Sequence, residues 1–485
     1  MLRREPVFHP FRGTAGSPPG ALRLLLAALL LVALLPAAGG AHTRLESSAP
    51  TADAVLRAAP TEIRLRFTGP AEPTLTGATL TTASGDTIPV GRATVEPGSG
   101  NRAYVIPIPT PLSPGQYLVE WRTAGTDGHV IRGAFSFLVE GLAPSAPAGP
   151  AADTAPPPEA VSVVAPPAGS SGTADAAAAY LPGSPLSVLV RWLAFTGLLG
   201  LVGSATFRLA VLPAAARRGL PSEAKERAVR GLRVAALASV AMFALGVAGR
   251  LWLQAAALVG PDGAAAEGAV ATILATGWGK AWTAQAAAAA VFLAGLLLFR
   301  GKEGATGWRT ATAAAVMAAA GTAFSGHAAG VERGRGLALL ADTLHVLGAG
   351  AWMGTLALLL VVGIPAALGA SAGGRGSAVA ALVRAFSPVA LAAAGLAAAT
   401  GVASALFHVG APADLWGSAY GRTLLLKLAL VAVAAGAGFR NWRFVTPRLE
   451  DDPEARSLRR SVAVEVAVGV GVVLVTAVLV ALPMP

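Results

Sequence analysis

Eight long apolar runs beyond residue 185 constrain the fold of this chain more than any other feature. Their approximate limits are 186–212, 232–259, 281–299, 309–328, 338–363, 378–408, 420–440 and 461–482. Each run is about as long as a helix must be to cross a hydrocarbon core of roughly 30 Å. Because that core holds no water for backbone groups, the runs must be helices. We predict an all-α polytopic membrane domain over residues 186–485.

The basic residues alternate between the loops that join these runs. The first, third, fifth and seventh loops carry most of them, for example Arg217 and Arg218 in the first and Arg459 and Arg460 in the seventh. Cytoplasmic loops are the ones enriched in Lys and Arg, so the odd loops are predicted to be cytoplasmic. Both ends of the mature chain then lie outside. The net charge of +11 is thus a topology signal: the bilayer is the expected partner, and nucleic acid is not.

The first 41 residues have the pattern of a secretory signal. Arginines at positions 3, 4, 12 and 23 precede an apolar core from Leu24 to Leu35, and Gly39 and Ala41 are small residues at the −3 and −1 positions. Cleavage after Ala41 would make His42 the first residue of the mature chain. Its α-amine and Nδ1 can chelate one metal ion, and tetragonal nitrogen and oxygen sites favour Cu(II) or Ni(II). A histidine without function near a cleavage site is the alternative.

Residues 42–140 alternate apolar and polar side chains with period two. The clearest examples are Ile63-Leu65-Phe67, Tyr117-Val119-Trp121 and Phe135-Phe137-Val139, and turn-forming clusters such as Ser84-Gly85-Asp86 separate them. Short alternating strands of this kind predict an all-β sandwich. The Ala- and Pro-rich residues 141–185 predict an extended linker between this domain and the membrane.

A second candidate metal-binding segment is Asp127-Gly128-His129, near the end of the β-rich region. Two residues that are two apart on an extended chain point to the same side. With His42 they would supply an amine, two imidazoles and a carboxylate. The alternative is a plain hairpin turn, which Asp-Gly commonly forms. The chain has no cysteine, so neither disulfides nor thiolate ligands are expected.

Residues 42–140 resemble the CopC copper-binding domain. The stretches that carry the resemblance are SAPTADAVL from Ser48, APTEIRLRF from Ala59, YLVEWR from Tyr117, the DGH motif and GAFSF from Gly133. The resemblance implies an Ig/cupredoxin-like sandwich in which His42, Asp127 and His129 bind Cu(II). Some members of the family also have a methionine-rich Cu(I) site, but this domain contains no Met, so the resemblance implies the Cu(II) site alone.

Three histidines, His327, His345 and His408, fall in the outer half of the predicted spans. Asp342 shares a helix face with His345, where a carboxylate can orient an imidazole for metal. Ionisable residues inside membranes are usually functional, although interfacial anchoring or a buried hydrogen bond would also explain them. Glu465 is a further intramembrane carboxylate. It could relay protons, balance a cation, or pair with Arg191, Arg250 or Lys427.

The region from about 186 to 482 resembles the CopD family of copper resistance membrane proteins. The matching stretches are SGHA from Ser325, the run from Asp342 to Gly354, Phe386-Ser387, and YGRTLLLK from Tyr420. The resemblance implies copper uptake across the inner membrane and copper tolerance. The resemblance also implies that His327 and His345 are residues of a copper path. The case for His408 is weaker. A CopC domain followed by a CopD domain implies a fused protein.

We therefore expect a multi-pass protein of a bacterial cytoplasmic membrane that handles copper and is not an enzyme. Its exported domain would bind Cu(II) and pass it to the membrane domain, and no P-loop pattern for ATP is present. Alternatives are envelope sequestration without transport, a haem or redox protein with span histidines as axial ligands, and a copper oxidase built on His42. An external copper donor and the oligomeric state stay open.

Overall fold

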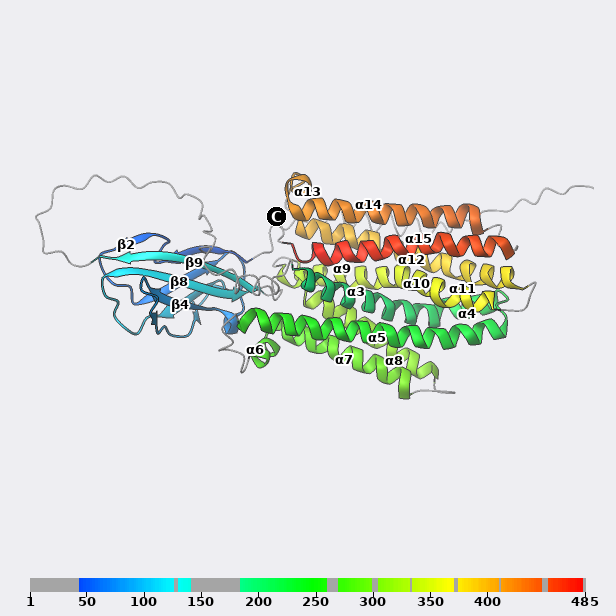
Figure 1. Ribbon diagram of the computed structural model, residues 1–485, viewed down its shortest axis with the longest axis horizontal. Coiled ribbons are helices and arrows are strands. Elements are labelled where there is room, and N and C mark those ends of the chain that lie inside the picture. The colour runs from blue at the N-terminus through cyan, green and yellow to red at the C-terminus, as the bar shows by residue number, and fades with distance from the viewer. Residues whose placement is uncertain are drawn as a thin grey trace, which may run out of the picture.

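The computed structural model describes residues 43–125, 130–140, 184–259, 269–298, 304–331, 334–369, 374–409, 411–446 and 452–482. The described residues up to 140 form a β-domain, and those from 184 onward form a helical domain. The β-domain lies at one end of the helix bundle (Figure 1). The predicted signal segment, most of the predicted linker, and His42, Asp127 and His129 all lie outside the described residues.

Two antiparallel-rich sheets form the β-domain, as the alternation predicts. One has four strands in the order β1-β3-β7-β6, and the other has five in the order β2-β9-β8-β4-β5. The strands are β1 (Leu45–Ala49), β2 (Ala54–Leu56), β3 (Glu62–Phe67), β4 (Gly77–Thr82), β5 (Thr87–Ile88), β6 (Thr94–Val95), β7 (Ala103–Pro107), β8 (Gly115–Ala124) and β9 (Val130–Val139), with a 3₁₀ turn η1 (Pro73–Leu75) before β4.

The inner faces of the two sheets bury the alternating apolar residues. Ile63, Leu65 and Phe67 of β3 are fully buried. The ring of Phe67 meets those of Tyr104 and Trp121 edge-on, at centroid distances of 6.0 and 5.6 Å. Aromatic pairs in this geometry stabilise a core beyond the area they bury. The β-domain thus has a complete hydrophobic core of its own.

The helical domain is a bundle of long helices with short π-helical segments inside several of them. The elements are α3 (Pro185–Thr206), η2 (Phe207–Val211), α4 (Leu212–Arg217), α5 (Ser222–Val259), α6 (Ala269–Ala275), α7 (Gly277–Leu298), α8 (Gly304–Phe324), η4 (His327–Gly330), α9 (Arg335–Ala349), η5 (Gly350–Gly354), α10 (Thr355–Leu358), η6 (Leu359–Gly363), α11 (Ile364–Leu368), α12 (Arg375–His408), α13 (Asp414–Gly417), α14 (Ala419–Arg440), η7 (Asn441–Val445) and α15 (Asp452–Leu479).

Seven of these helical stretches are long and apolar enough to cross a membrane, against the eight predicted spans. They are Pro185–Arg217, Ser222–Ala257, Gly277–Leu298, Arg335–Leu368, Arg375–Phe407, Ala419–Phe444 and Leu458–Leu479. The remaining predicted span corresponds to α8, a helix of 21 residues. Its Ala, Gly and Thr side chains make it less hydropathic, yet it packs along α7 within the bundle and at 1.5 Å per residue is about 30 Å long. The count of eight is therefore approximate.

Local signals in the sequence explain where two of the spans begin. The hydroxyl of Ser184 accepts a hydrogen bond from the Ser187 amide at 3.2 Å, and Pro185 occupies the first turn of α3. At α14 the hydroxyl of Ser418 accepts from the Gly421 amide at 2.8 Å. Serine caps satisfy amides that a helix start leaves unpaired, and proline fits the first turn because it lacks that amide.

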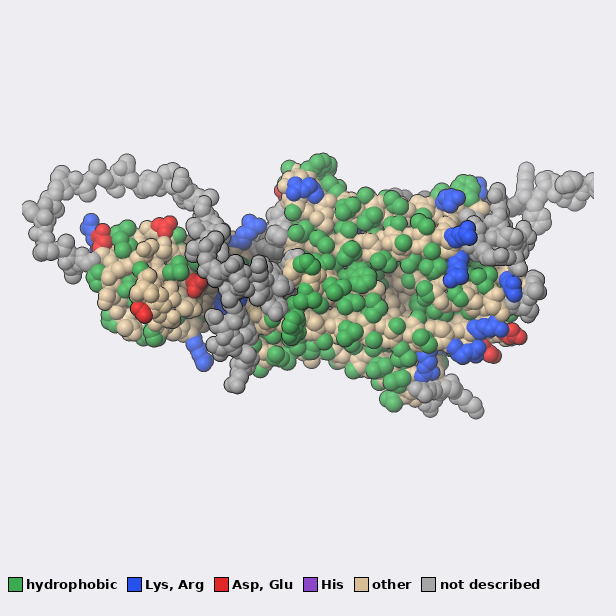
Figure 2. All heavy atoms as spheres, viewed as in Figure 1, with side chains coloured by type: hydrophobic (Ala, Val, Ile, Leu, Met, Phe, Trp, Pro, Cys, Tyr) green, Lys and Arg blue, Asp and Glu red, His purple; other side chains and the backbone are tan. Residues whose placement is uncertain are grey.

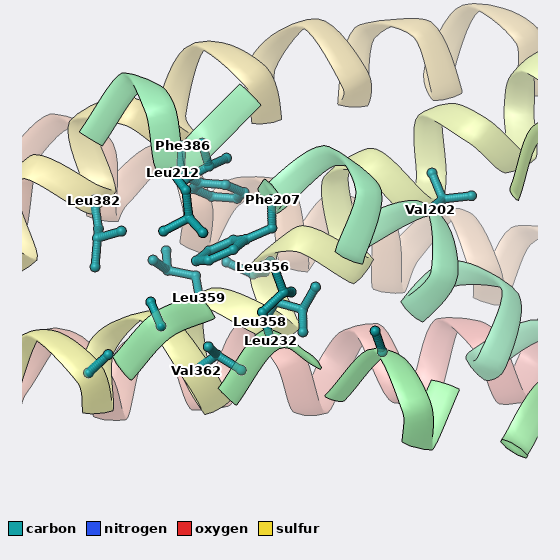
Figure 3. Close-up of a cluster of buried hydrophobic side chains, with 14 of the residues drawn as sticks. Val202, Phe207, Leu212, Leu232, Leu356, Leu358, Leu359, Val362, Leu382 and Phe386 are labelled. Atoms are coloured by element: carbon teal, nitrogen blue, oxygen red, sulfur yellow. The ribbon is translucent and has the colours of Figure 1, made fainter. Parts of the chain in front are cut away.

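The half of the bundle away from the β-domain is filled by apolar side chains. Figure 3 shows Phe207, Leu212, Leu359 and Leu382 converging from η2, α4, η6 and α12, and all four are buried. Figure 1 places α4 and α11 at this end. On the face in Figure 2, most Lys and Arg side chains of the bundle also gather there. Such clustering at one end of a bundle is typical of cytoplasmic loops.

Candidate functional site

The residue after His42 is held firmly in the β-domain. Thr43 is buried, and its hydroxyl donates a hydrogen bond to the Pro70 carbonyl at 3.0 Å. One residue later, the amide of Arg44 donates to the Thr68 hydroxyl at 2.9 Å, and the Thr68 amide donates back to the Arg44 carbonyl at 2.9 Å. The start of the described chain is therefore fixed against residues 68–70.

The residues before the DGH motif are fixed against the same part of the domain. Gly125 forms an antiparallel bridge with Ala71, and the Glu72 amide donates to the Ala124 carbonyl at 2.8 Å. On the other side of the motif, Val130 pairs with Ala124 in the ladder of β8 and β9. Residues 68–72 thus hold the described neighbours of both predicted ligand segments, although the ligands themselves lie outside the described residues.

Tyr104 holds residues 68–72, which we call the anchoring segment, through a hydrogen bond from the core. Its hydroxyl donates a 2.6 Å hydrogen bond to the Ala71 carbonyl, and its ring is fully buried. Burial raises the pKa of Tyr104 to about 12 because the phenolate would lose its hydration. The hydroxyl therefore stays protonated and keeps donating to Ala71 throughout the physiological range.

His345 lies on α9 and is hydrogen-bonded to the neighbouring helix α12. Its Nδ1–H donates to the Ala397 carbonyl at 2.9 Å, because a carbonyl can only accept. In the neutral ring the lone pair is then on Nε2, which is the arrangement that a metal-binding imidazole needs. Gly401 allows this packing, since a Cβ there would approach the His345 ring atom Cε1 to 3.1 Å. The helix pair thus fixes the tautomer and orientation of the imidazole.

Four further ionisable groups lie near His345 at the end of the bundle that faces the β-domain. Asp342 interacts electrostatically with Lys427, His327 and Tyr420, and Lys427 also interacts with His345. Asp342 and His345 come from α9, Lys427 and Tyr420 from α14, and His327 from η4. We call these five residues the outer polar cluster. It brings together three of the predicted path residues and adds Lys427 and Tyr420.

His327 also contacts the last helix. Its Nε2 donates to the Val480 carbonyl at 3.2 Å. His408 ends α12, but its side chain is not among those described. Within the described ranges, no group of three or more His, Cys, Asp or Glu side chains could hold a metal ion. A copper path through these histidines therefore stays a prediction, and the outer polar cluster is not a preformed three-ligand site.

Glu465 lies apart from the outer polar cluster. Asn441, at the start of η7, donates from Nδ2 to its Oε1, and the Ser461 hydroxyl donates to Asn441 Oδ1 at 2.7 Å. The hydrogen-bond partner of Glu465 among the described residues is therefore an amide, and its proposed roles in proton relay, charge balance or ion pairing stay predictions. Lys427 stands 14 residues before Asn441 in the same helical stretch, roughly 20 Å away at 1.5 Å per residue.

Sequence reasoning missed a polar network around Arg250 of α5. The guanidinium donates to Gln285 Oε1 at 3.3 Å and to the Ser325 hydroxyl at 3.2 Å, and it lies 5.5 Å from the centre of the Trp278 ring. The Gln285 amide nitrogen also donates to Ser325 Oγ at 3.0 Å. An arginine inside an apolar run was the available signal, but its neutral partners on α7 and beyond α8 have no recognisable spacing.

Comparisons with known proteins divide the chain in the same way. Residues 45–140 match the CopC domain family, residues 182–337 match "Copper resistance protein D-like, N-terminal domain", and residues 380–479 match "Copper resistance protein D". Together these matches cover both the β-domain and most of the helical domain.

Individual relatives show the same pattern. The "Copper transport protein CutJ" of Bacillus subtilis is 24% identical over 464 residues, which is 94% of this chain and 77% of that protein. The "Copper resistance protein C" of Escherichia coli is 38% identical over 106 residues, 21% of this chain and 82% of that protein. Among solved structures, PcoC, a methionine-rich copper resistance protein from Escherichia coli, matches with 38% identity over 20% of this chain and 99% of that one, with a TM-score of 0.18.

Proposed function

The chain belongs to the copper resistance proteins that join a CopC domain to a CopD membrane domain, and from this we propose that it captures Cu(II) outside the cytoplasmic membrane and passes it to its helical domain. The ion is the cargo, and no chemical conversion of another substrate is involved. Import and copper tolerance would be the outcome. The Bacillus subtilis relative is named a copper transport protein, and its match covers 94% of this chain. This supports transport as well as binding.

Capture is assigned to the α-amine and Nδ1 of His42, the carboxylate of Asp127 and the imidazole of His129. The observation that carries this assignment is that one segment, residues 68–72, holds both Thr43 and Gly125. Segments that flank a ligand set must be brought together by the fold, and nitrogen and oxygen donors of these kinds suit Cu(II). The proposal needs cleavage after Ala41, because an uncleaved chain has no α-amine at His42.

Transfer is assigned to the outer polar cluster, with His345 Nε2 as the first imidazole acceptor and His327 beside it. The hydrogen bond to Ala397 supports this role because it directs the Nε2 lone pair away from the backbone contact. Asp342 would balance part of the charge of an arriving cation. The position of His408 at the end of α12 makes it a secondary candidate.

The proposed orientation places the β-domain outside a bacterial cytoplasmic membrane. Two independent features support it: the signal pattern of residues 1–41, and the gathering of basic side chains at the end of the bundle away from the β-domain (Figure 2). Val480, near the end of α15, contacts His327 at the end that faces the β-domain. The C-terminus would therefore be extracytoplasmic too.

The decisive experiment measures copper in the cytoplasmic and envelope fractions of cells grown with limiting external copper. Cells with the intact chain are compared with cells lacking it and with cells carrying His345→Ala or, as a matched control, Gln116→Ala on the β-domain. We expect more cytoplasmic copper with the intact chain and a loss of that gain with His345→Ala. More envelope copper with unchanged cytoplasmic copper would mean sequestration and would exclude import.

A further inference from the structure

The β-domain packs on an apolar surface formed by the outer ends of α5, α6 and α7. Leu75 of η1 and Ala124 of β8 join Ile273 and Trp278 in one buried cluster, and these four residues are 7%, 0%, 1% and 5% exposed. Two of them come from each domain. We call the helical side of this contact the docking surface, defined by Ala255, Ala257, Ile273, Gly277 and Trp278.

Two polar contacts flank the apolar cluster and match the polarity of the helices. The Gly277 amide, at the start of α7, donates to Glu72 Oε1 at 3.3 Å. The Arg132 guanidinium donates to the Ala257 carbonyl in the last turn of α5. A helix start carries partial positive charge and a helix end partial negative charge, so an anion at the first and a cation at the second both favour binding. The contact therefore has a preferred orientation.

The docking surface contacts residues that stand before and after Asp127 and His129, two of the proposed copper ligands. Ala124 belongs to the buried cluster, and Val130 packs against it. These two residues stand on either side of the DGH motif and pair with each other in the ladder of β8 and β9. Both described ends of the ligand-bearing segment are thus held at the contact between the domains.

Direct contacts lead from the docking surface to the turn that bears His327. Trp278 lies at the interface, and the Arg250 guanidinium is 5.5 Å from its ring centre. Arg250 in turn donates to the Ser325 hydroxyl at 3.2 Å, and Ser325 stands two residues before His327. The surface on which the β-domain packs is therefore continuous with the outer part of the proposed path.

We propose that the β-domain acts as a docked cap, releasing copper to the helical domain while seated on the docking surface rather than leaving and returning on its linker. The occupant of the surface is this chain's own β-domain. The inference deepens the proposed function and rests on it. A tethered shuttle would gain from a long linker through effective concentration, whereas a docked cap needs no excursion at all.

Cross-linking in the full chain in membrane vesicles tests the docking itself. Because the natural chain has no cysteine, Leu75→Cys with Ile273→Cys gives a single pair of thiols for a short bis-maleimide, which we expect to join them efficiently. The control pair is Val55→Cys with Ile273→Cys. Val55 is on β2 and pairs with Leu138 of β9, which is eight residues and roughly 26 Å along that strand from Val130.

A second pair guards against misfolding caused by the buried substitutions. Thr74→Cys with Ala275→Cys uses exposed positions beside the first pair. Equal yields for the docking pairs and the control pair, or no cross-link in either docking pair, would overturn the docked position. These yields are read without copper and so do not depend on the proposed function.

Uptake of radioactive copper by energised right-side-out vesicles then tests whether docking suffices. The cross-linked chain is compared with single-cysteine chains capped by N-ethylmaleimide, which removes free thiols as competing ligands. Undiminished uptake after cross-linking supports the docked cap. Loss of uptake only in the cross-linked chain overturns it and restores a shuttle, with the proposed function intact. No uptake by the natural chain overturns the proposed function and the docked cap with it.

Discussion

The segments that flank the proposed ligands of the β-domain and the side chains of the outer polar cluster both lie toward the end where the domains meet, but they are held in different ways. In the β-domain, backbone pairing and the buried hydroxyl of Thr43 fix the neighbours of the ligand segments to residues 68–72. In the helical domain, single side chains come from three separate elements and interact with one another's charges. Chelation by a rigid frame suits capture, while dispersed single donors suit passage, because a transported ion must also leave.

The largest expected effect follows from removing His42, the histidine that is proposed to chelate Cu(II). For His42→Ala in the full chain, we expect Cu(II) affinity to fall by more than about 100-fold, beyond the 10- to 100-fold cost of losing a group that only orients a ligand. Competition with a coloured chelator measures it. His327→Ala is the matched control and should leave capture unchanged. Equal losses for both variants would mean that capture is not confined to the β-domain.

The anchoring segment can be weakened without touching a ligand. Tyr104→Phe leaves the Ala71 carbonyl without the hydroxyl that donates to it, and an unpaired buried acceptor costs about 1–3 kcal/mol. We expect the β-domain to unfold at a lower denaturant concentration, as measured by tryptophan fluorescence. We also expect its Cu(II) affinity to fall. Tyr117→Phe, whose hydroxyl donates to Ser113 instead, should lose stability without losing affinity. The opposite pattern would contradict a role for residues 68–72.

The same residue predicts a pH dependence. The pKa of Tyr104 is about 12 in the folded domain and about 10 in an unfolded chain, so the unfolded state releases its proton first. The stabilising contribution is complete below pH 10 and disappears as the pH rises towards 12. At 1.36 kcal/mol per pKa unit this amounts to roughly 3 kcal/mol. Chemical denaturation across that range measures it, and the Phe variant should not show this component.

Removing Lys427, the cation of the outer polar cluster, tests how the helical domain binds and releases copper. Lys427 interacts with both Asp342 and His345, and its positive charge disfavours another cation beside them. We expect Lys427→Met to bind copper about tenfold more tightly at the helical domain, equivalent to 1.4 kcal/mol, and to release it more slowly in vesicle uptake. Arg422→Gln, an exposed charge at the start of the same helix, is the control. Weaker copper binding by Lys427→Met would contradict this role.

The smallest expected effect concerns the contact between the two regions. Burial raises the pKa of Glu72 above its usual value, against the opposing effects of the Gly277 amide and Lys280. Relative to the unfolded chain, the folded protein therefore binds this proton more tightly, so this contribution to stability is present below the unfolded pKa of Glu72 and is lost as the pH rises through the raised folded pKa. Glu72→Gln should remove this component from the pH dependence of chemical denaturation and keep most of the cross-link yield of the Leu75–Ile273 pair. Glu72→Ala, which loses the acceptor for the Gly277 amide, should lower that yield.

The sequence was most informative where one physical rule dominates. Period-two alternation predicted β3, β8 and β9 correctly because each strand buries one face, as Ile63, Leu65 and Phe67 show. Apolar length predicted the spans because the bilayer admits only helices. The predicted grouping of Asp342 with His345 follows from helix geometry, and the structure adds His327 and Lys427 to it.

Features that depend on contacts between distant segments were not predictable. The partner of Glu465 is Asn441, and no spacing rule indicates such a pair. No spacing rule indicates the close contact at Gly354 of the π-helical segment η5 either, where a Cβ would meet the Leu199 carbonyl oxygen at 2.0 Å. Docking through Leu75 and Ile273 depends on two surfaces about 200 residues apart, each unremarkable by itself.

The apolar filling around Phe207, Leu212, Leu359 and Leu382 (Figure 3) has an electrical consequence. A membrane potential falls across material of low dielectric constant, and this filling is such material, lying toward the end of the bundle away from the β-domain. An ion beside His345 would still have to cross this part of the voltage, out of about 2.3 kcal/mol per charge for 100 mV. In the proposed orientation, a negative cell interior would therefore accelerate the inward step.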